Sequence, residues 1–242
     1  MTAVADWSFA GFGDQFDEHA HAHLPHYDLV TEMAAFVASF ALPVGGRLAD
    51  LGCSTGRTIE AVADRVPERR FHAIGYDLDA SMLEVAGKRL ASRTTVDLCL
   101  ISGDLRSGVS GHDDADVTLA LWTLQFLPRS SWVDLLTEAR SRSTRDGLLL
   151  LAAKTRLPDA RWQEIGDAAV AEWKASRGVT PDEALAKSRS LRGTMLLVTL
   201  GSLLDALDEA GWTSATVLFR WHQWVLVGAW AEPVREHPHG GQ

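Results

Sequence analysis

The stretch Arg47-Leu48-Ala49-Asp50-Leu51-Gly52-Cys53-Ser54-Thr55-Gly56 decides the fold of this chain. An apolar strand runs into a turn with two glycines, and a helical pattern follows from about Gly56 to Val66. A backbone approaches a bulky ligand only where side chains are small, and Gly52 and Gly56 meet that need. The amides that open the helix point partial positive charge into the turn. The segment therefore predicts a strand, a ligand-binding turn and a helix.

The spacing of this turn indicates which nucleotide-like ligand it takes. Dinucleotide-binding turns have glycines spaced G-x-G-x-x-G, whereas Gly52 and Gly56 are spaced G-x-x-x-G. Asp50 ends the strand, where a carboxylate suits an ammonium group, and the small polar Ser54 lies inside the turn. Asp77 ends the next apolar run, and its two oxygens suit the hydroxyls of a ribose. An amino-acid tail and a ribose fit these groups better than a pyrophosphate, which favours S-adenosylmethionine.

Asp77 has an alternative role, because an acid at a strand end also caps a following helix. Asp79 is the better cap, since a helical pattern starts directly after it. A third apolar run, from Val96 to Ile101, leads to Asp104, a position where an acid accepts from an adenine amine. A fourth runs from Ala115 to Leu121. We expect these four strand ends to line one rim of the sheet.

Strand and helix patterns alternate from Arg47 to Ala153, which predicts an α/β, Rossmann-like, mostly parallel sheet. Two late apolar runs, 212–219 and 221–229, leave no room for a crossover helix, so we expect one antiparallel C-terminal strand. A helical insertion over about 158–190 is expected to cover the strand ends as a lid. We expect one domain over residues 1–231 and a disordered tail over 232–242. Further helices are expected over 27–40, 56–66, 79–91, 129–142 and 199–210, and a fifth strand over 147–153.

Composition excludes several classes of function. With 242 residues, 46% of them apolar, the chain buries a core without disulfides, and Cys53 and Cys99 form no C-x-x-C pair. The chain has no apolar run of membrane-spanning length and no leader pattern, so we expect a cytoplasmic protein without a membrane contact. A net charge of −9 disfavours extended nucleic-acid binding.

Two local clusters of basic residues or histidines stand out in this acidic chain. Lys187, Arg189 and Arg192 form either a solvated cationic face or a site for a small anionic or aromatic substrate. A histidine cluster near the N-terminus has ligand-like spacing if it is helical, because three of its members then share a face. No cysteine or carboxylate completes such a site, so we expect no metal and interpret the cluster as a partly exposed entry segment. Its members are His19, His21, His23 and His26.

The glycine turn, Asp77, Gly103-Asp104 and the antiparallel end together resemble the class I S-adenosylmethionine-dependent methyltransferases. More narrowly, the chain resembles the carboxy-S-adenosylmethionine synthases, which supply the donor for tRNA wobble-uridine modification. This resemblance spans Asp6 to about Ala229. It is carried by Asp6-Trp7-Ser8-Phe9, Leu24-Pro25-His26-Tyr27, Thr123-Leu124-Gln125-Phe126-Leu127 and Ser188-Arg189-Ser190.

The resemblance implies a cofactor, a reaction and an assembly. S-adenosylmethionine or carboxy-S-adenosylmethionine would be bound, with Arg189 gripping the extra carboxylate, across the interface of a homodimer. Prephenate would lose carbon dioxide and become phenylpyruvate, while the carbon dioxide is added to the cofactor's methyl group. Catalysis would rest on positioning and electrostatics, so no residue is assigned as acid or base. The implied cofactor contacts are Tyr27, Gly52, Cys53, Ser54, Asp77, Leu78, Asp104 and Leu105.

One departure from the family keeps other functions open. Leu121 stands at a cofactor-contact position where the synthases have an asparagine, and it neither donates nor accepts a hydrogen bond. One alternative is methyl transfer to a small acceptor, in a pocket shaped by the insertion and by tryptophans. Another is a non-catalytic, cofactor-binding regulatory protein. The tryptophans are Trp122, Trp162, Trp173, Trp221 and Trp224.

Overall fold

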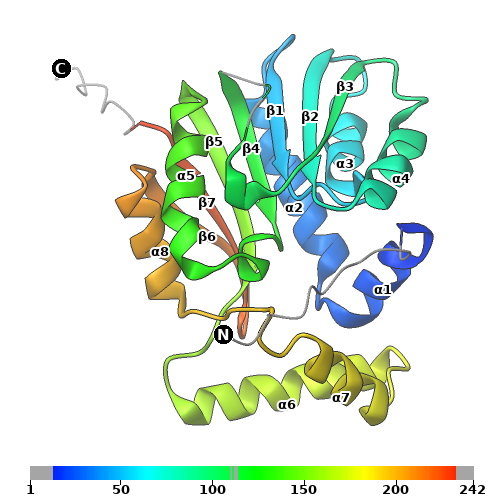
Figure 1. Ribbon diagram of the computed structural model, residues 1–242, viewed down its shortest axis with the longest axis vertical. Helices are drawn as coiled ribbons and strands as arrows, with labels where there is room; N and C mark the ends of the chain where they lie inside the picture. The colour runs from blue at the N-terminus through cyan, green and yellow to red at the C-terminus, as the bar shows by residue number, and fades with distance from the viewer. Residues whose placement is uncertain (1–12, 110, 112–113, 233–242) are drawn as a thin grey trace, which may run out of the picture.

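The computed structural model describes residues 13–109, 111 and 114–232, which build one seven-stranded sheet between helices (Figure 1). The strand order is β3-β2-β1-β4-β5-β7-β6. The first five strands pair in parallel, and β7 runs antiparallel to both β5 and β6. The predicted α/β class and antiparallel C-terminal strand are confirmed. The strands are β1 Arg47–Leu51, β2 Phe71–Asp77, β3 Val96–Ser102, β4 Ala115–Leu121, β5 Ser143–Lys154, β6 Thr213–Trp221 and β7 Trp224–Trp230.

Helices cover both faces of the sheet. Helices α2 to α4 pack with one core cluster, and α5 and α8 pack with the other (Figure 1). Short 3₁₀ turns lie at 13–15, 105–107, 124–126 and 129–131. The helices are α1 Phe16–His23, α2 Tyr27–Ala41, α3 Arg57–Arg65, α4 Ala80–Leu90, α5 Trp132–Ser141, α6 Ala160–Ser176, α7 Pro181–Ser190 and α8 Leu200–Glu209.

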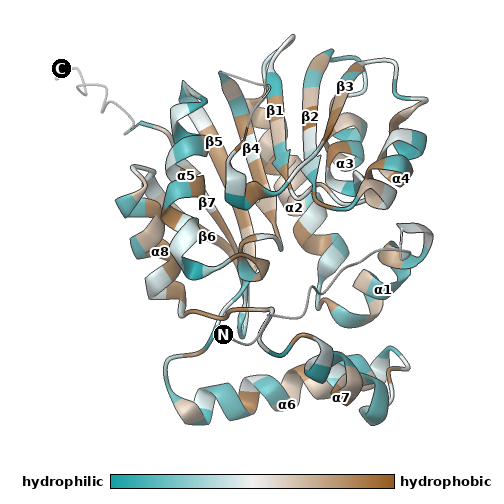
Figure 2. Cartoon of the chain, viewed as in Figure 1, coloured by the Kyte–Doolittle hydropathy of each residue, from teal (hydrophilic) through white to brown (hydrophobic). Residues whose placement is uncertain are grey.

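The central strands are apolar on both faces because both faces are covered. Along β5, Leu148 and Leu150 join the core under α2, whereas Leu149 and Leu151 join the core under α5 and α8. Figure 2 shows these central strands mainly in brown, while α6 carries much teal. The continuous apolar runs of the sequence are therefore buried strands, and α6 lies outside both cores.

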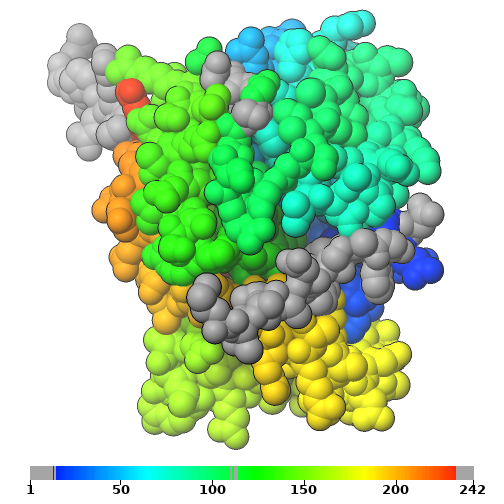
Figure 3. Space-filling view, in the orientation of Figure 1, coloured from blue at the N-terminus to red at the C-terminus, as the bar shows by residue number. Residues whose placement is uncertain are grey.

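The insertion forms a layer at the end of the sheet where β5 finishes, with α6 and α7 below the strands (Figures 1 and 3). Asp167 Oδ1 on α6 accepts from Gln163 Nε2 at 3.0 Å and from Gln223 Nε2 at 3.1 Å. The Gln223 carbonyl accepts from the amide of Thr155, directly after β5, at 2.6 Å. Hydrogen bonds thus fix α6 to the β6–β7 hairpin. Thr180 and Glu183 form a capping box that starts α7.

Several element boundaries differ from the prediction. β5 begins four residues early, at Ser143, and the helix expected over 129–142 splits into a 3₁₀ turn and α5. The insertion breaks between α6 and α7, as expected from Gly178 and Pro181. The segment Asp6–Phe9 and the expected disordered tail after Glu232 lie outside the described residues. Among the described residues, no helix is long and apolar enough to span a bilayer.

Candidate functional site

The glycine turn joins β1 to α3 in a left-handed conformation. Gly52, Ser54 and Gly56 have φ values of +85°, +49° and +74°. The amides of Gly52 and Cys53 both donate to the carbonyl of Tyr76 at 2.8 Å, which binds the turn to the end of β2. A Cβ atom on Gly52 would overlap the side chain of Thr123 after β4. The turn therefore lies between the ends of β1 and β4, where the strand order reverses and open α/β sheets bind ligands.

Two carboxylates flank this turn without a cation. Asp50 is 2% exposed, and burial together with the nearby charge of Asp77 raises its pKa to about 7. Burial also raises the pKa of Asp77, whose oxygens accept from the amides of Ser54 at 2.8 Å and Asp79 at 2.9 Å. Neither carboxylate forms an ion pair within the part of the chain that the structure describes. A buried acidic pair of this kind fits a cationic ligand, such as the ammonium and sulfonium groups of S-adenosylmethionine.

The two acids at and after the end of β2 make different hydrogen bonds, because only one of them caps α4. Asp79 caps α4, accepting from the amide of Ser81 at 2.9 Å, as predicted. Asp77 accepts from the amide of Ser54 in the glycine turn and from the amide of Asp79, which precedes α4. The N-cap of α4 is therefore Asp79, and the ribose contact of Asp77 stays a prediction.

The end of β3 lies beside Asp77. The amide of Gly103 donates to the carbonyl of Asp77 at 3.0 Å, and a Cβ on Gly103 would meet nothing within 4 Å. Asp104 accepts from the amide of Arg106 at 2.9 Å, and hydrogen bonds from that guanidinium lower the pKa of its carboxyl. Leu105 is buried. The structure thus brings this strand end to the acidic pair.

Other predicted contact residues have different surroundings. Leu78 is 68% exposed, whereas Leu121 is buried at the end of β4. Cys53 packs under Gly75, where a Cβ would lie 2.7 Å from its sulfur, and burial raises the pKa of the thiol. Tyr27 opens α2, and burial raises the pKa of its phenol.

Arg189 is exposed on α7 and forms no ion pair among the described residues. Within one chain, the structure does not bring it to the glycine turn. Lys187, two residues away, is instead half-buried beside α1, where burial and the nearby Lys174 lower its pKa to about 8. The cationic cluster is therefore only partly a solvated face.

A row of partly buried lysines lies between the strand ends and the insertion, and it was not predicted from the sequence. Lys154 ends β5, and its Nζ lies 5.4 Å from the ring centroid of Trp224. Burial lowers the pKa of Lys154, against the opposing charge of Asp167. Burial and the charge of Lys154 lower the pKa of Lys174 on α6. Through Lys187, the row continues to α1.

The histidines at the end of this row are uncharged near neutral pH. The rings of His19 and His23 lie 4.3 Å apart on α1, and burial and the nearby lysines lower both pKa values to about 4. His26 lies outside α1 in a left-handed conformation, so the expected helical face of three histidines does not form. It packs instead on Trp221, 5.1 Å between ring centroids.

Gln125 is a further residue whose role the sequence left open, although its segment supported the resemblance. It is 1% exposed, and its Oε1 accepts from the amide of Lys154 at 2.7 Å. Its carbonyl accepts from the amide of Leu196 at 2.7 Å, where the chain returns from the insertion. Gln125 therefore sets the position of Lys154 and of the insertion together.

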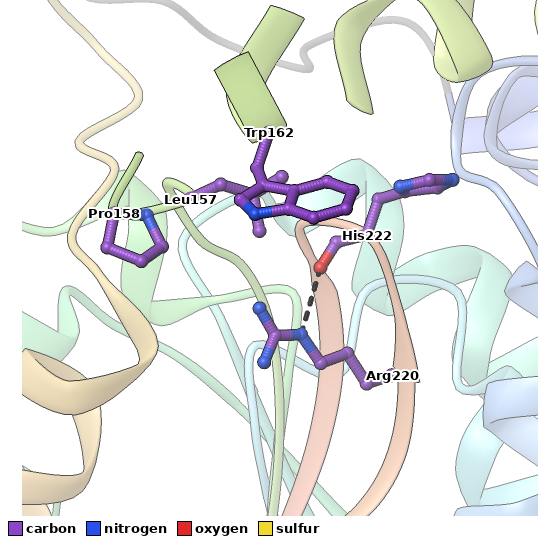
Figure 4. Close-up of a pocket in the computed structure, with 5 residues that line it drawn as sticks. All are labelled: Leu157, Pro158, Trp162, Arg220 and His222. Carbon is purple, nitrogen blue, oxygen red and sulfur yellow. Dashed lines mark hydrogen bonds between the residues drawn. The ribbon is translucent and has the colours of Figure 1, made fainter. Parts of the chain in front are cut away.

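A shallow cavity of about 260 Å³ lies outside this region, where α6 begins (Figure 4). Its walls are Leu157, Pro158, Trp162, Arg220 and His222, and the Arg220 side chain donates to the carbonyl of His222 at 3.1 Å. It holds no carboxylate and no part of the glycine turn. We therefore place the functional site at the strand ends.

Comparison with known proteins agrees with this geometry. Residues 48–147, from β1 into β5, match the family model described as methyltransferase domain. The chain is 28% identical over 226 residues to the carboxy-S-adenosyl-L-methionine synthase of Methylococcus capsulatus, covering 90% of this chain and 92% of that one. The synthase of Haemophilus ducreyi is 25% identical, with 90% and 89% covered.

Solved structures show the same fold. A putative O-methyltransferase from Nostoc punctiforme superposes with a TM-score of 0.64 at 17% identity over 95% of this chain, which spans only 64% of that structure. A TehB-like SAM-dependent methyltransferase from Corynebacterium glutamicum gives 0.55 at 14% identity, with 90% and 95% covered. The predicted resemblance to class I S-adenosylmethionine-dependent transferases, and to the carboxy-S-adenosylmethionine synthases among them, is confirmed.

Proposed function

We propose that the protein is a carboxy-S-adenosylmethionine synthase that converts S-adenosylmethionine and prephenate to carboxy-S-adenosylmethionine and phenylpyruvate. The observation that carries this proposal is the row Lys154, Lys174 and Lys187: Lys154 ends β5 with its Nζ 5.4 Å from the Trp224 ring centroid, and Lys174 and Lys187 lie on the helices α6 and α7 of the insertion. A dianionic substrate relieves the mutual repulsion of these lysines, and a neutral one does not. The relatives named as synthases, matched along about nine-tenths of their length, support the same assignment.

The residues at the glycine turn fit the cofactor by their chemistry. We propose that Asp50 binds its ammonium group, that Asp77 binds the ribose hydroxyls, and that Asp104 accepts from the adenine amine. Tyr27 and Leu121 would close the walls of this site. The backbone of the turn would lie against the amino-acid tail, and Leu78 and Leu105 against the base. The turn residues are Gly52, Cys53, Ser54 and Gly56.

When bound, the cofactor supplies a methyl carbon activated by its positive sulfur. The protein's own residues then have three tasks. The insertion excludes water, the lysine row holds the substrate's carboxylates, and the acidic pair orients the cofactor. No general acid or base is needed for these tasks, and we assign none.

We extend the proposal to the assembly and the setting of the protein. Residues 1–231 act as one domain, and two chains form a homodimer in which Arg189 reaches the partner's cofactor. Exposure of Arg189 on α7 supports this arrangement, because the side chain is available to a second chain. A cytoplasmic location agrees with Cys53 and Cys99, which form no disulfide.

Mass spectrometry of nucleosides from the purified protein, and of products formed with S-adenosylmethionine with or without prephenate, tests the synthase assignment. We expect carboxy-S-adenosylmethionine only when prephenate is supplied. Arg189→Leu should remove the preference for the carboxylated cofactor and leave S-adenosylmethionine binding intact, with Arg192→Leu as the matched control. Unchanged S-adenosylmethionine in every sample would reject the assignment.

Methyl transfer to a small anionic acceptor is the second candidate. Two observations favour it: Arg189 lies exposed on α7, and Leu121 lacks the side-chain amide expected of a synthase. A methylated acceptor, formed with S-adenosylhomocysteine and unaffected by prephenate, would support this candidate. A protein that binds the cofactor tightly and turns over no substrate would instead be regulatory.

A further inference from the structure

We propose that the indole N–H groups of Trp122 and Trp224 and the ammonium group of Lys154 form a carboxylate-binding subsite for the small anionic substrate. The inference rests on the proposed function for the identity of that substrate. It goes further by assigning the residues that select it. All three side chains lie where β4 and β5 end and β7 begins, beside the segment that contacts the glycine turn.

Trp122 is held in an unusual position directly after β4. Its φ is +62°, which is rare for a bulky residue, and its amide donates to the carbonyl of Ala152 at 2.7 Å. The residue is 8% exposed, yet its indole nitrogen has no hydrogen-bond acceptor among the described residues. Strained backbone and orphaned donors both collect at functional sites. Because the preceding Leu121 offers no polar group, Trp122 supplies the donor at this strand end.

Trp224 repeats the pattern on the neighbouring element. It is 4% exposed, and its indole nitrogen also lacks an acceptor in the part of the chain that the structure describes. Its ring centroid lies 5.5 Å from that of Trp122 in an edge-to-face arrangement. Lys154 is its direct partner across the β5–β7 ladder, with Nζ 5.4 Å from the ring centroid. Within the described part of the chain, Lys154 forms no ion pair. Two buried donors and a partly buried cation therefore share one small region.

The chemistry of these groups defines the ligand. An indole nitrogen only donates, and so does an ammonium group, so the missing partner is an acceptor. The lysine favours a negative acceptor, and Lys174 and Lys187 extend the positive charge along the insertion. The counter-charges that face this row are Asp167 and Glu183, and Asp167 already accepts from two glutamine amides. A substrate carboxylate satisfies both donors and the cation at once.

Phenylalanine substitutions test this subsite, because they keep the ring and remove the N–H. We expect Trp122→Phe and Trp224→Phe each to raise the KM for prephenate about tenfold, with the KM for S-adenosylmethionine within about twofold of wild type. Lys154→Met should raise the KM for prephenate further. Trp230→Phe, at the opposite end of β7, and Lys88→Met, exposed on α4, are the matched controls and should change neither KM.

Calorimetric titration of S-adenosylhomocysteine-loaded protein with phenylpyruvate gives a readout that needs no turnover. We expect about tenfold weaker binding in each tryptophan variant, with a melting temperature equal to or above that of wild type because an orphaned donor has been removed. If the wild-type protein binds phenylpyruvate and the substitutions weaken this binding, but the wild type does not turn over prephenate, the synthase assignment is rejected and the subsite is retained. Unchanged KM and unchanged phenylpyruvate affinity in both tryptophan variants would overturn the subsite, as would lost melting temperature with unchanged affinity.

Discussion

Replacing Asp50 by asparagine should stabilise the ligand-free protein and abolish cofactor binding. The side chain is 2% exposed at the end of β1, and Asp77 adds negative charge beside it. No cation pairs with it among the described residues. Its ionised form is therefore unfavourable until a cationic ligand arrives.

The size of the effect follows from the raised pKa. Asp50 has a pKa of about 7 in the folded protein against 3.8 ordinarily, so between those values the folded state holds a proton that the unfolded chain has lost. The free energy of unfolding therefore falls as pH rises from about 4 to 7 and levels off above 7. About 3 pKa units at about 1.4 kcal/mol each gives an upper bound of about 4 kcal/mol. Asparagine does not ionise, so the Asp50→Asn variant does not lose free energy of unfolding in this way as pH rises.

Thermal unfolding of the ligand-free variant at pH 5 and pH 8, against wild type and the exposed Asp205→Asn control, measures this difference. The stability gain of Asp50→Asn should be larger at pH 8 than at pH 5 by about 2–3 kcal/mol, and the control should show no such change. Titration calorimetry at pH 8 should show S-adenosylmethionine affinity at least about 100-fold lower. The same stability difference at both pH values, or retained affinity, would refute this account of Asp50.

Two further substitutions test how the site is built. Gly52→Ala should lower stability by about 2–4 kcal/mol, because φ is +85° and the new Cβ overlaps Thr123; denaturant unfolding should show a smaller loss in a Thr123→Ala background, and equal losses would contradict the overlap. Gln125→Leu should cost about 1–3 kcal/mol by orphaning the amide of Lys154. A change within about 0.5 kcal/mol, measured in the same way, would show that this hydrogen bond does not hold the end of β5.

The turn and its acids were predictable because their signals are local. Gly52 and Gly56 are needed for positive φ, and Asp79 caps α4 through an amide two residues away. The strands were predictable for the same reason, since a sheet covered on both faces requires long apolar runs. The sequence also excluded a crossover between 219 and 221, which made the last strand antiparallel.

The lysine row was not predictable because its members come together only through tertiary contacts. Lys154 stands at the end of an apolar run, and Lys174 lies on a helix of mixed polar and apolar residues that is mostly exposed. Lys187 and Arg189 are two residues apart, which on an α-helix places them about 200° apart around the axis. One therefore faces α1 while the other faces solvent. A count of charges along the sequence combines Lys187 and Arg189 into one cluster, although only Lys187 is half-buried.

The two halves of the site carry opposite charge, and under the proposed function this separation would let an acidic protein bind an anionic substrate. Asp50 and Asp77 lie at the turn after β1, whereas Lys154, Lys174 and Lys187 lie toward the insertion. Burial, together with the like charge beside each group, raises the pKa of Asp50 and lowers that of Lys187, so a ligand of opposite charge favours the ionised form in each half. A cationic cofactor relieves the acidic half and an anionic substrate relieves the basic half. Because the bound ligands also attract each other, binding of one should strengthen binding of the other, which gives an ordered approach of the two reactants without a catalytic acid or base.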